Sequence, residues 1–279
     1  MSKTPTPHRA RKRFGQNFLH DTGIINRIVD AIHPQAGQHL VEIGPGQGAL
    51  TEFLVGSGCQ LDVIELDRDL VPGLLAAYNH KPEFELHSAD ALKFDYTELA
   101  ANDDRPLRVV GNLPYNISTP LIFKLLENAA LIQDMHFMLQ LEVVNRLAAS
   151  PGNKNWGRLG IMAQYHCHVE SLFEVPPSAF SPAPKVQSAI VRLEPRTDSP
   201  WQACDESMLR RVVQASFAQR RKTLRNNLKG LVASDELESL DIDPGARAET
   251  LELAQFILIA NAASQMQDNS ETLPTHGKN

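Results

Sequence analysis

Residues 41–51 read VEIGPGQGALT, an apolar run that passes through three glycines into a helical pattern. Glycine permits positive φ and lets a ligand approach closely, because it has no Cβ. The run 39–43 predicts a strand, and the pattern from Ala49 onward predicts a helix. A strand, a glycine turn and a helix start are typical of the nucleotide-binding corner of a doubly wound α/β sheet.

An acidic residue follows at the end of the next predicted strand, 60–66. Glu65 stands 21 residues after Gly44, where a carboxylate can accept hydrogen bonds from ribose hydroxyls. Two other interpretations stay open at this point. The glycines could form a simple turn, or they could bind a nicotinamide dinucleotide. Dinucleotide sites more often have the spacing G-x-G-x-x-G, because their pyrophosphate lies at a helix N-terminus.

Strands alternate with helices along most of the chain, which predicts a doubly wound sheet. After a first helix at 22–32, the strands are expected at 39–43, 60–66, 84–87, 107–110, 135–141, 169–175 and 186–193. The last two could form a hairpin. Four short helical patterns then fill 208–262, which predicts a small all-helical C-terminal domain. The expected division is a flexible basic arm at 1–13, an α/β domain at 14–196, a helical domain at 205–264 and a disordered tail at 265–279.

Composition restricts the class of protein. The 279 residues are 42% hydrophobic, as in a globular protein, and no apolar run is long enough to span a membrane. The basic N-terminus lacks the apolar core of a signal peptide. The three cysteines are scattered without C-x-x-C spacing, which argues against disulfides and a structural zinc site. We therefore expect a cytoplasmic protein, without bound metal and without membrane contact, that acts as a monomer.

Positive charge is concentrated in two runs that contain no acid. The net charge is −6, with 27 basic and 33 acidic residues, yet 12 of the basic residues lie within 1–17 and 208–229. Two basic runs on an acidic body are typical of an anion-binding surface, in particular one for nucleic acid. The alternative is a disordered arm together with a solvated helix face.

Residues 112–115 read NLPY and follow the predicted strand 107–110. The exocyclic amine of a base is a poor nucleophile until its hydrogens are held. The Asn112 side-chain oxygen and the Leu113 backbone carbonyl could each accept one such hydrogen, while Pro114 stiffens the loop. Tyr115 offers a ring on which an extruded base can stack. The alternative is an ordinary Asn-Pro turn that leads into a helix.

Together, residues 41–51 and 112–115 resemble the S-adenosylmethionine-dependent amino-group methyltransferases of nucleic acids. Leu113 replaces the first proline of their Asn-Pro-Pro-Tyr signature, as in the rRNA adenine dimethyltransferases. The segments 14–19 (FGQNFL), 180–188 (FSPAPKVQS) and 220–228 (RRKTLRNNL) also resemble that family. The resemblance extends from about Arg13 to Ala262 and is strongest to the bacterial branch that acts on the small subunit.

This resemblance implies a Rossmann-like methyltransferase domain that dimethylates N6 of two adjacent adenines in the 3′-terminal hairpin loop of 16S rRNA. It also implies a role in small-subunit biogenesis. The implied cofactor-binding residues, for S-adenosyl-L-methionine, are Asn17, Leu19, Gly44, Glu65, Asp90 and Asn112. The implied catalytic residues are Asn112, Leu113, Tyr115 and Phe180, and the implied RNA-binding residues are Arg220, Arg221, Lys222 and Arg225. Without the resemblance, Asp90 would be a helix-capping acid and Phe180 a core aromatic.

Three other functions compete with this one. A large-subunit rRNA adenine dimethyltransferase of the macrolide-resistance type shares the fold and the chemistry, but segments 14–19 and 220–228 favour the small-subunit enzyme. A non-catalytic ribosome assembly factor would have no need of an intact NLPY. A nicotinamide oxidoreductase lacks its third glycine and a hydride-transfer site.

Overall fold

The computed structural model describes residues 16–101, 105–197 and 202–271. The described residues divide into two compact units. The first comprises the described part of Met1–Val144 together with Cys167–Pro195, and the second comprises Asn145–His166 together with the described part of Arg196–Asn279. The predicted basic arm, 1–13, and residues 14 and 15 of the FGQNFL segment lie outside the described residues.

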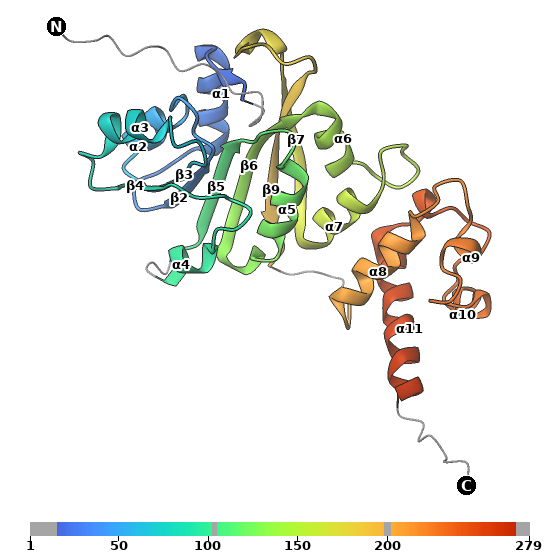
Figure 1. The fold of residues 1–279 in the computed structure, drawn as a ribbon. Coiled ribbons are helices and arrows are strands. Elements are labelled where there is room, and N and C mark those ends of the chain that lie inside the picture. Colours follow the sequence, from blue (N-terminus) through green and yellow to red (C-terminus); the bar gives the residue numbers. More distant parts are fainter. Residues whose placement is uncertain (1–15, 102–104, 198–201, 272–279) are drawn as a thin grey trace, which may run out of the picture. The chain divides into compact units, whose positions relative to one another are not determined.

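A seven-stranded sheet forms the centre of the first unit (Figure 1). In spatial order its strands are β4 (Phe84–His87), β3 (Gln60–Ile64), β2 (His39–Ile43), β5 (Leu107–Asn112), β6 (Ile132–Gln140), β9 (Ser188–Pro195) and β7 (Cys167–Val175). Neighbours from β4 to β6 are parallel, whereas β9 is antiparallel to both β6 and β7. The doubly wound prediction is confirmed, and the last two long strands do pair.

The helices of this unit are α1 (Thr22–Ile32), α2 (Thr51–Gly56), α3 (Val71–Tyr78), α4 (Tyr96–Ala101), α5 (Ser118–Leu126) and the start of α6 (Leu141–Leu147). Asp21 begins α1, because its side chain accepts a hydrogen bond from the Ile24 backbone amide at 3.0 Å. The isoleucines of α1 then pack on Leu40 and Leu61 of the sheet. Helices α4 and α6, which are only six and seven residues long, were not predicted from the sequence.

Arg108 ties α1 to the sheet from inside. It lies on β5, is 5% exposed, and makes an ion pair with Asp134 of β6 at 2.9 Å. The same guanidinium donates to the Ile32 backbone carbonyl at 2.6 Å, at the C-terminus of α1. A cation is favourable there, because the last carbonyls of a helix lack intrahelical partners and carry partial negative charge.

A second, two-stranded sheet joins segments that are far apart in the sequence. β1 (Phe18–Leu19) pairs antiparallel with β8 (Phe180–Ser181), so that Leu19 lies opposite Phe180. The short 3-10 helix Pro177–Ala179 precedes β8, and the Ala179 carbonyl accepts a hydrogen bond from the His20 amide. This pairing positions the residues just before α1.

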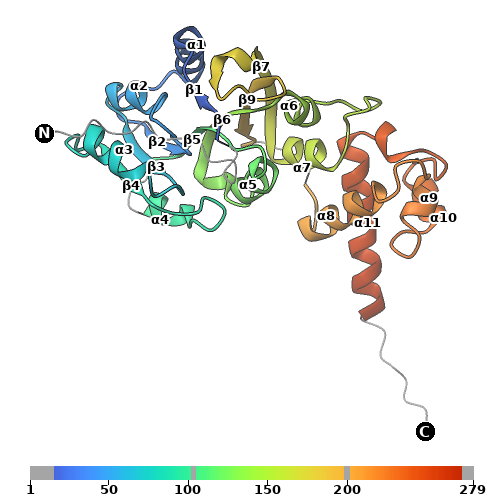
Figure 2. The same ribbon diagram turned by 45° about the horizontal axis from the view of Figure 1, so that its top comes forward.

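The second unit is helical. It contains α7 (Arg158–His166), α8 (Glu206–Ser216), α9 (Leu224–Asn227), α10 (Ser234–Ser239), the 3-10 helix Ala248–Thr250 and α11 (Leu253–Glu271), with α8 and α11 side by side (Figure 2). This division also breaks the chain after residue 195, but it groups residues 145–166, predicted as part of the α/β domain, with the helices. Trp156 is 2% exposed there and donates a hydrogen bond to the Leu251 carbonyl.

The final helix is also longer than expected. α11 continues through Glu271, into the region predicted as a tail from 265. No helix in the described ranges is long and apolar enough to cross a membrane.

Candidate active site

The glycine turn after β2 has the geometry for which glycine is needed. Gly44 and Gly46 have φ of 67° and 61°, a region that other residues rarely adopt. A Cβ on Gly46 would lie 3.1 Å from the Phe18 ring. Glycine at position 46 therefore lets the Phe18 ring pack closely against the turn.

A cavity of about 330 Å³ adjoins this turn in the first unit. It lies at the carboxyl ends of the parallel strands, where open α/β sheets bind ligands. Its walls are formed by residues 16–19, 42–47, 49–50, 64–66, 89–91 and 112–117. The charged side chains of this lining are all acidic, namely Glu42, Glu65 and Asp90. The cavity therefore has the charge of a site for a cationic ligand.

Glu65 is held by backbone amides at the end of β3. It is 6% exposed and accepts hydrogen bonds from Asp67 N at 2.7 Å and Gly46 N at 3.3 Å. Burial raises the pKa of Glu65 above its usual value, although these hydrogen bonds oppose the shift. The carboxylate is positioned by the glycine turn and the loop after β3, as expected for a preformed ligand acceptor.

Glu42 is a cavity residue that the sequence analysis did not select. It is 2% exposed and accepts a hydrogen bond from the Thr51 hydroxyl at 2.6 Å. Burial raises the pKa of Glu42 to about 7; the Thr51 hydrogen bond opposes this shift, and the nearby charge of Glu65 adds to it. The signal was an acid in a buried strand, two residues before the first glycine.

Asp90 lies in the turn after β4, at the cavity wall. Its side chain accepts a hydrogen bond from Leu92 N at 3.0 Å, as a capping acid does, and it also lines the cavity. The turn that follows β4 therefore fixes the carboxylate at the cavity wall.

Asn112 is the last residue of β5, and its side chain is held by the N-terminal segment. Its Nδ2 donates to the Asn17 backbone carbonyl at 3.1 Å. With the amide nitrogen engaged in this way, Oδ1 is the acceptor that the side chain offers to a ligand. Leu113 follows with its side chain 1% exposed, and its backbone amide donates to the Met138 carbonyl. The NLPY loop is therefore held by both β6 and residue 17.

Tyr115 lines the same cavity, whereas Phe180 does not. The Tyr115 hydroxyl lies 2.9 Å from the Ser188 hydroxyl, and burial raises the pKa of Tyr115 above its usual value. Phe180 is 4% exposed and packs in the hydrophobic core together with Leu19. The core position that was the alternative for Phe180 is thus the one it occupies here, and the two rings do not face each other across the cavity.

The predicted RNA-binding cations are not equivalent. Arg221, Lys222 and Arg225 are exposed in the second unit. Arg220 instead makes an ion pair with Glu249 at 3.2 Å and donates to the Lys154 backbone carbonyl. Within the same acid-free run, Arg210 pairs with Glu206 at 2.6 Å. Two arginines of the run are therefore paired with acids outside it, Arg220 with the distant Glu249 and Arg210 with Glu206 just before the run.

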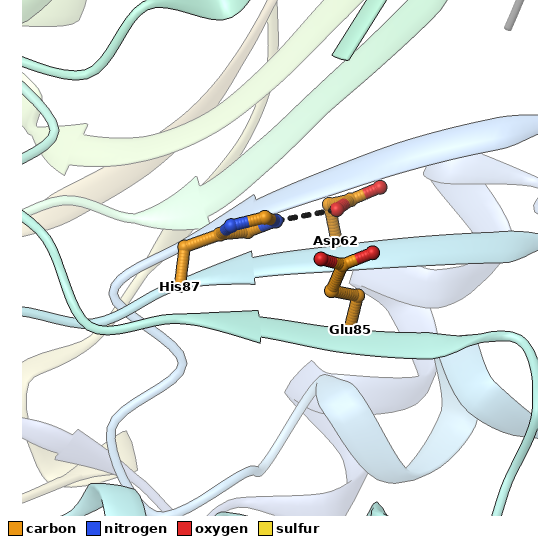
Figure 3. Close-up of side chains that lie close together, drawn as sticks. All are labelled: Asp62, Glu85 and His87. Carbon is orange, nitrogen blue, oxygen red and sulfur yellow. Dashed lines mark hydrogen bonds and ion pairs between the residues drawn. The ribbon is translucent and has the colours of Figure 1, made fainter. Parts of the chain in front are cut away.

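The described residues include one group with the side chains of a metal site, Asp62, Glu85 and His87 on β3 and β4 (Figure 3). Their ligand atoms lie within 4.8 Å of one another. However, His87 Nε2 and His39 Nε2 are hydrogen-bonded to the two oxygens of Asp62, at 2.5 and 2.6 Å. Because these contacts already satisfy the buried carboxylate, we interpret the group as a structural hydrogen-bond network. The expectation of no metal stays a prediction.

The sheet order and the glycine turn define a Rossmann-like domain, with an acidic cavity where such sheets bind ligands. A family model of ribosomal RNA adenine dimethylases matches residues 7–265, and the chain belongs to that family. The enzyme class predicted from the sequence, an S-adenosylmethionine-dependent rRNA adenine dimethyltransferase, is thereby confirmed.

Relatives match over nearly the whole chain. A Pseudomonas aeruginosa protein named ribosomal RNA small subunit methyltransferase A is 60% identical over 94% of this chain and 97% of its own length. A protein of the same name from Chromohalobacter salexigens is 57% identical over 95% of each chain.

Two solved structures are similar to the whole fold, each at 25% identity. A Plasmodium falciparum dimethyladenosine transferase has a TM-score of 0.75 and covers 92% of this chain and 98% of its own. The 23S rRNA methyltransferase ErmE has a TM-score of 0.69 and covers 89% of this chain and 100% of its own.

Proposed function

We propose that this enzyme dimethylates N6 of two adjacent adenines in the 3′-terminal hairpin loop of 16S rRNA, during small-subunit biogenesis. The observation that carries the proposal is the acidic cavity beside the Asn112 amide. The choice of the small subunit is supported by two relatives that match this chain nearly end to end. Both are named ribosomal RNA small subunit methyltransferase A.

The cavity fits S-adenosyl-L-methionine better than a dinucleotide. This cofactor has a sulfonium, an ammonium and a carboxylate group, so it is positive overall, and it has no phosphate; this suits a described lining that has three acids and no basic side chain. The pyrophosphate of a dinucleotide would instead meet like charge.

When bound, the cofactor supplies an electrophilic methyl group. Glu65 would accept hydrogen bonds from the ribose hydroxyls and Asp90 one from the adenine amino group. Asn17 and Leu19 would cover the cofactor, with Gly44 beneath it.

The target adenine would be held by the NLPY loop. Asn112 Oδ1 and the Leu113 carbonyl would each accept one N6 hydrogen, which orients the nitrogen lone pair toward the methyl group. Tyr115 would stack on one face of the base. Phe180 is assigned to the opposite face, and because its ring is 4% exposed, this assignment requires the ring to turn out of the core when RNA binds.

Phosphate contacts are assigned to the exposed cations of the second unit. Arg221, Lys222 and Arg225 present their charges to solvent, whereas Arg220 shares its charge with Glu249. Arg220 would therefore shape this surface more than it binds RNA. We expect one protein molecule for each subunit, since nothing in the proposed reaction requires a second copy.

The test is to incubate the protein with labelled S-adenosylmethionine and unmethylated small subunits, large subunits or free rRNA, and then to map the label. We expect label on N6 of two adjacent adenines near the 3′ end of 16S rRNA. Label on large-subunit RNA would assign the macrolide-resistance type of activity instead. Tight binding to small subunits without any label would identify an assembly factor.

A further inference from the structure

We propose that Gln16 and Asp67 are positioning residues, which clasp the segment 16–19 across the cofactor cavity and thereby hold the Asn112 amide in its working orientation. The proposal rests on the proposed function for the identity of the cofactor. It adds two residues to which neither the sequence analysis nor the family resemblance gave a role.

All four residues of the segment line the cavity. At its C-terminal end the segment is anchored by the pairing of Leu19 with Phe180 and by the hydrogen bond from His20 to Ala179. At its N-terminal end Gln16 Nε2 donates to Asp67 Oδ2 at 2.9 Å. Between these anchors, the Asn17 carbonyl accepts the hydrogen bond from Asn112.

Asp67 is a rigid anchor for this clasp. It is 1% exposed, and its other carboxylate oxygen accepts a hydrogen bond from Asp69 N at 3.2 Å. Its own backbone amide donates to Glu65 Oε1 at 2.7 Å. The position of the segment is thus connected to the carboxylate proposed to bind the ribose.

The consequence concerns both binding and catalysis. A segment fixed at both ends keeps the Asn17 carbonyl opposite Asn112, so the amide nitrogen stays engaged and Oδ1 remains the acceptor. A segment fixed at one end alone would leave the cofactor exposed and let the amide rotate. Breaking the clasp should therefore speed cofactor release. Its effect on methyl transfer should be smaller than its effect on release, since bound cofactor itself restrains residues 17 and 19.

The test uses reversed hydrogen-bond partners. Gln16→Glu places two carboxyl groups against each other and should break the clasp. Asp67→Asn keeps an oxygen for Asp69 N, and its new amide group can pair with the oxygen of Gln16 or of a glutamate. The double variant Gln16→Glu/Asp67→Asn should therefore restore the clasp. Gln35→Glu is the matched control, because Gln35 is an exposed glutamine of the same unit, remote from the cavity.

Binding and release of S-adenosylhomocysteine are measured by calorimetry and stopped flow. We expect Gln16→Glu to raise its dissociation constant and its release rate roughly tenfold, the scale of one hydrogen bond to a charged group. The double variant and Gln35→Glu should stay within about threefold of the parent on the same scale. A parent-like Gln16→Glu, or a double variant as weak as Gln16→Glu, overturns the clasp.

Hydrogen exchange of the Phe18 and Leu19 amides in the ligand-free protein tests the clasp without the cofactor. These amides should exchange faster in Gln16→Glu and return to the parent rate in the double variant. Exchange that is equal in all variants overturns the clasp even if binding changes. If the parent itself does not bind S-adenosylhomocysteine, the cofactor assignment fails, and hydrogen exchange still decides the clasp.

Discussion

Asn112 shows how one side chain can serve two partners. Its amide nitrogen is taken by the Asn17 carbonyl, so its oxygen is the atom left for the target amine. An amide is suited to this place because a carboxylate could not donate to Asn17. The residue is therefore both a part of the cavity wall and the group that would act on the base.

Replacing Asn112 with alanine removes this acceptor while leaving Pro114 and Tyr115 in place. By comparison with other single positioned polar groups, the methyl-transfer rate should fall by about 10²–10³-fold. Single-turnover methylation at saturating cofactor measures this rate. Binding to small subunits should persist, because the exposed cations are untouched.

Asn128→Ala is the control for this change, since Asn128 donates to the Lys124 carbonyl outside the cavity. It should methylate at the parent rate. Parent-like transfer by Asn112→Ala would show that Asn112 is not used as proposed.

The His39–Asp62–His87 network makes the stability of the protein depend on pH. The hydrogen bond to Asp62 raises the pKa of His87 above 6.5, and the charges of Asp62, Glu85 and Glu98 act in the same direction. Burial alone would raise the pKa of Asp62, but the hydrogen bonds from His39 and His87 outweigh it and lower the value. Proton uptake by His87 therefore favours the folded state.

The sign of the pH dependence follows from these shifts. Stabilisation by His87 is fully present below its unfolded pKa of about 6.5 and is lost as the pH rises through the higher folded pKa. The lowered pKa of Asp62 means that its contribution is lost only at a pH below about 3.8. His87→Gln should therefore reduce the free energy of unfolding more in mildly acid solution than in alkaline solution. Urea titrations across this range measure the difference, with the exposed His80→Gln as control. A loss that does not depend on pH would contradict this account.

At the scale of the elements, the close approach of β5 to β2 positions the NLPY loop. A Cβ on Gly111 would lie only 2.5 Å from the Ile43 backbone carbonyl oxygen. Both partners are backbone of paired strands, so neither can move without shifting Asn112 or the glycine turn. The glycine before Asn112 therefore serves packing between strands, which the sequence analysis did not recognise.

Gly111→Ala should destabilise the protein by about 1–3 kcal/mol, the usual effect of overpacking a core. Methyl transfer should also slow, because Asn112 is displaced. Chemical denaturation and single-turnover methylation measure the two effects. Gly73→Ala in α3 is the control: no atom lies within 4 Å of its added Cβ, and alanine favours a helix. Equal stability of the two variants would contradict the close approach.

Elements with a strong local pattern were predicted well. α1 was expected at its observed bounds, and β2, β3 and β4 were expected within two residues of their observed ends. The short α4 and α6 were missed, because six or seven residues give too few turns for a clear period. The pairing of β1 with β8 carries no local pattern at all, because two-residue strands are defined only by their partner.

At the scale of the molecule, charge is arranged by the fold as well as by the sequence. The run 208–229 contains seven basic residues and no acid, yet two of its arginines pair with acids that lie outside the run. The other five basic residues of the run, all exposed, are Arg211, Arg221, Lys222, Arg225 and Lys229. The fold thus reduces the positive charge that this run presents to RNA, because two of its seven basic residues are paired with acids.

Removing exposed cations should change how RNA binding depends on salt. If Arg221 and Lys222 each contact one phosphate, each alanine should reduce the slope of log K against log salt by roughly 0.7–0.9. Arg220→Ala should reduce the slope less, because Arg220 is paired with Glu249. Filter binding at several salt concentrations measures the slopes, with Lys81→Ala in the first unit as control. An unchanged slope in Arg221→Ala/Lys222→Ala would assign these side chains to another role.

The sequence by itself determined the alternation of strands and helices, the glycine turn and the NLPY loop. These depend on hydrophobic period, glycine conformation and short motifs, all of which act over a few residues. Most of the cavity wall followed as well, since the carboxyl ends of parallel strands meet at one edge of a sheet, as Glu65, Asp90 and Asn112 do here.

Only the tertiary structure decided which polar groups form hydrogen bonds with one another. Gln16 meets Asp67 across 51 residues, and Asn112 meets Asn17 across 95. It also placed Phe180 in the core and drew residues 145–166 to the helical unit. The physical reason is that burial and hydrogen-bond pairing depend on neighbours in space, and a polar or aromatic side chain has no period in the sequence that identifies its partner.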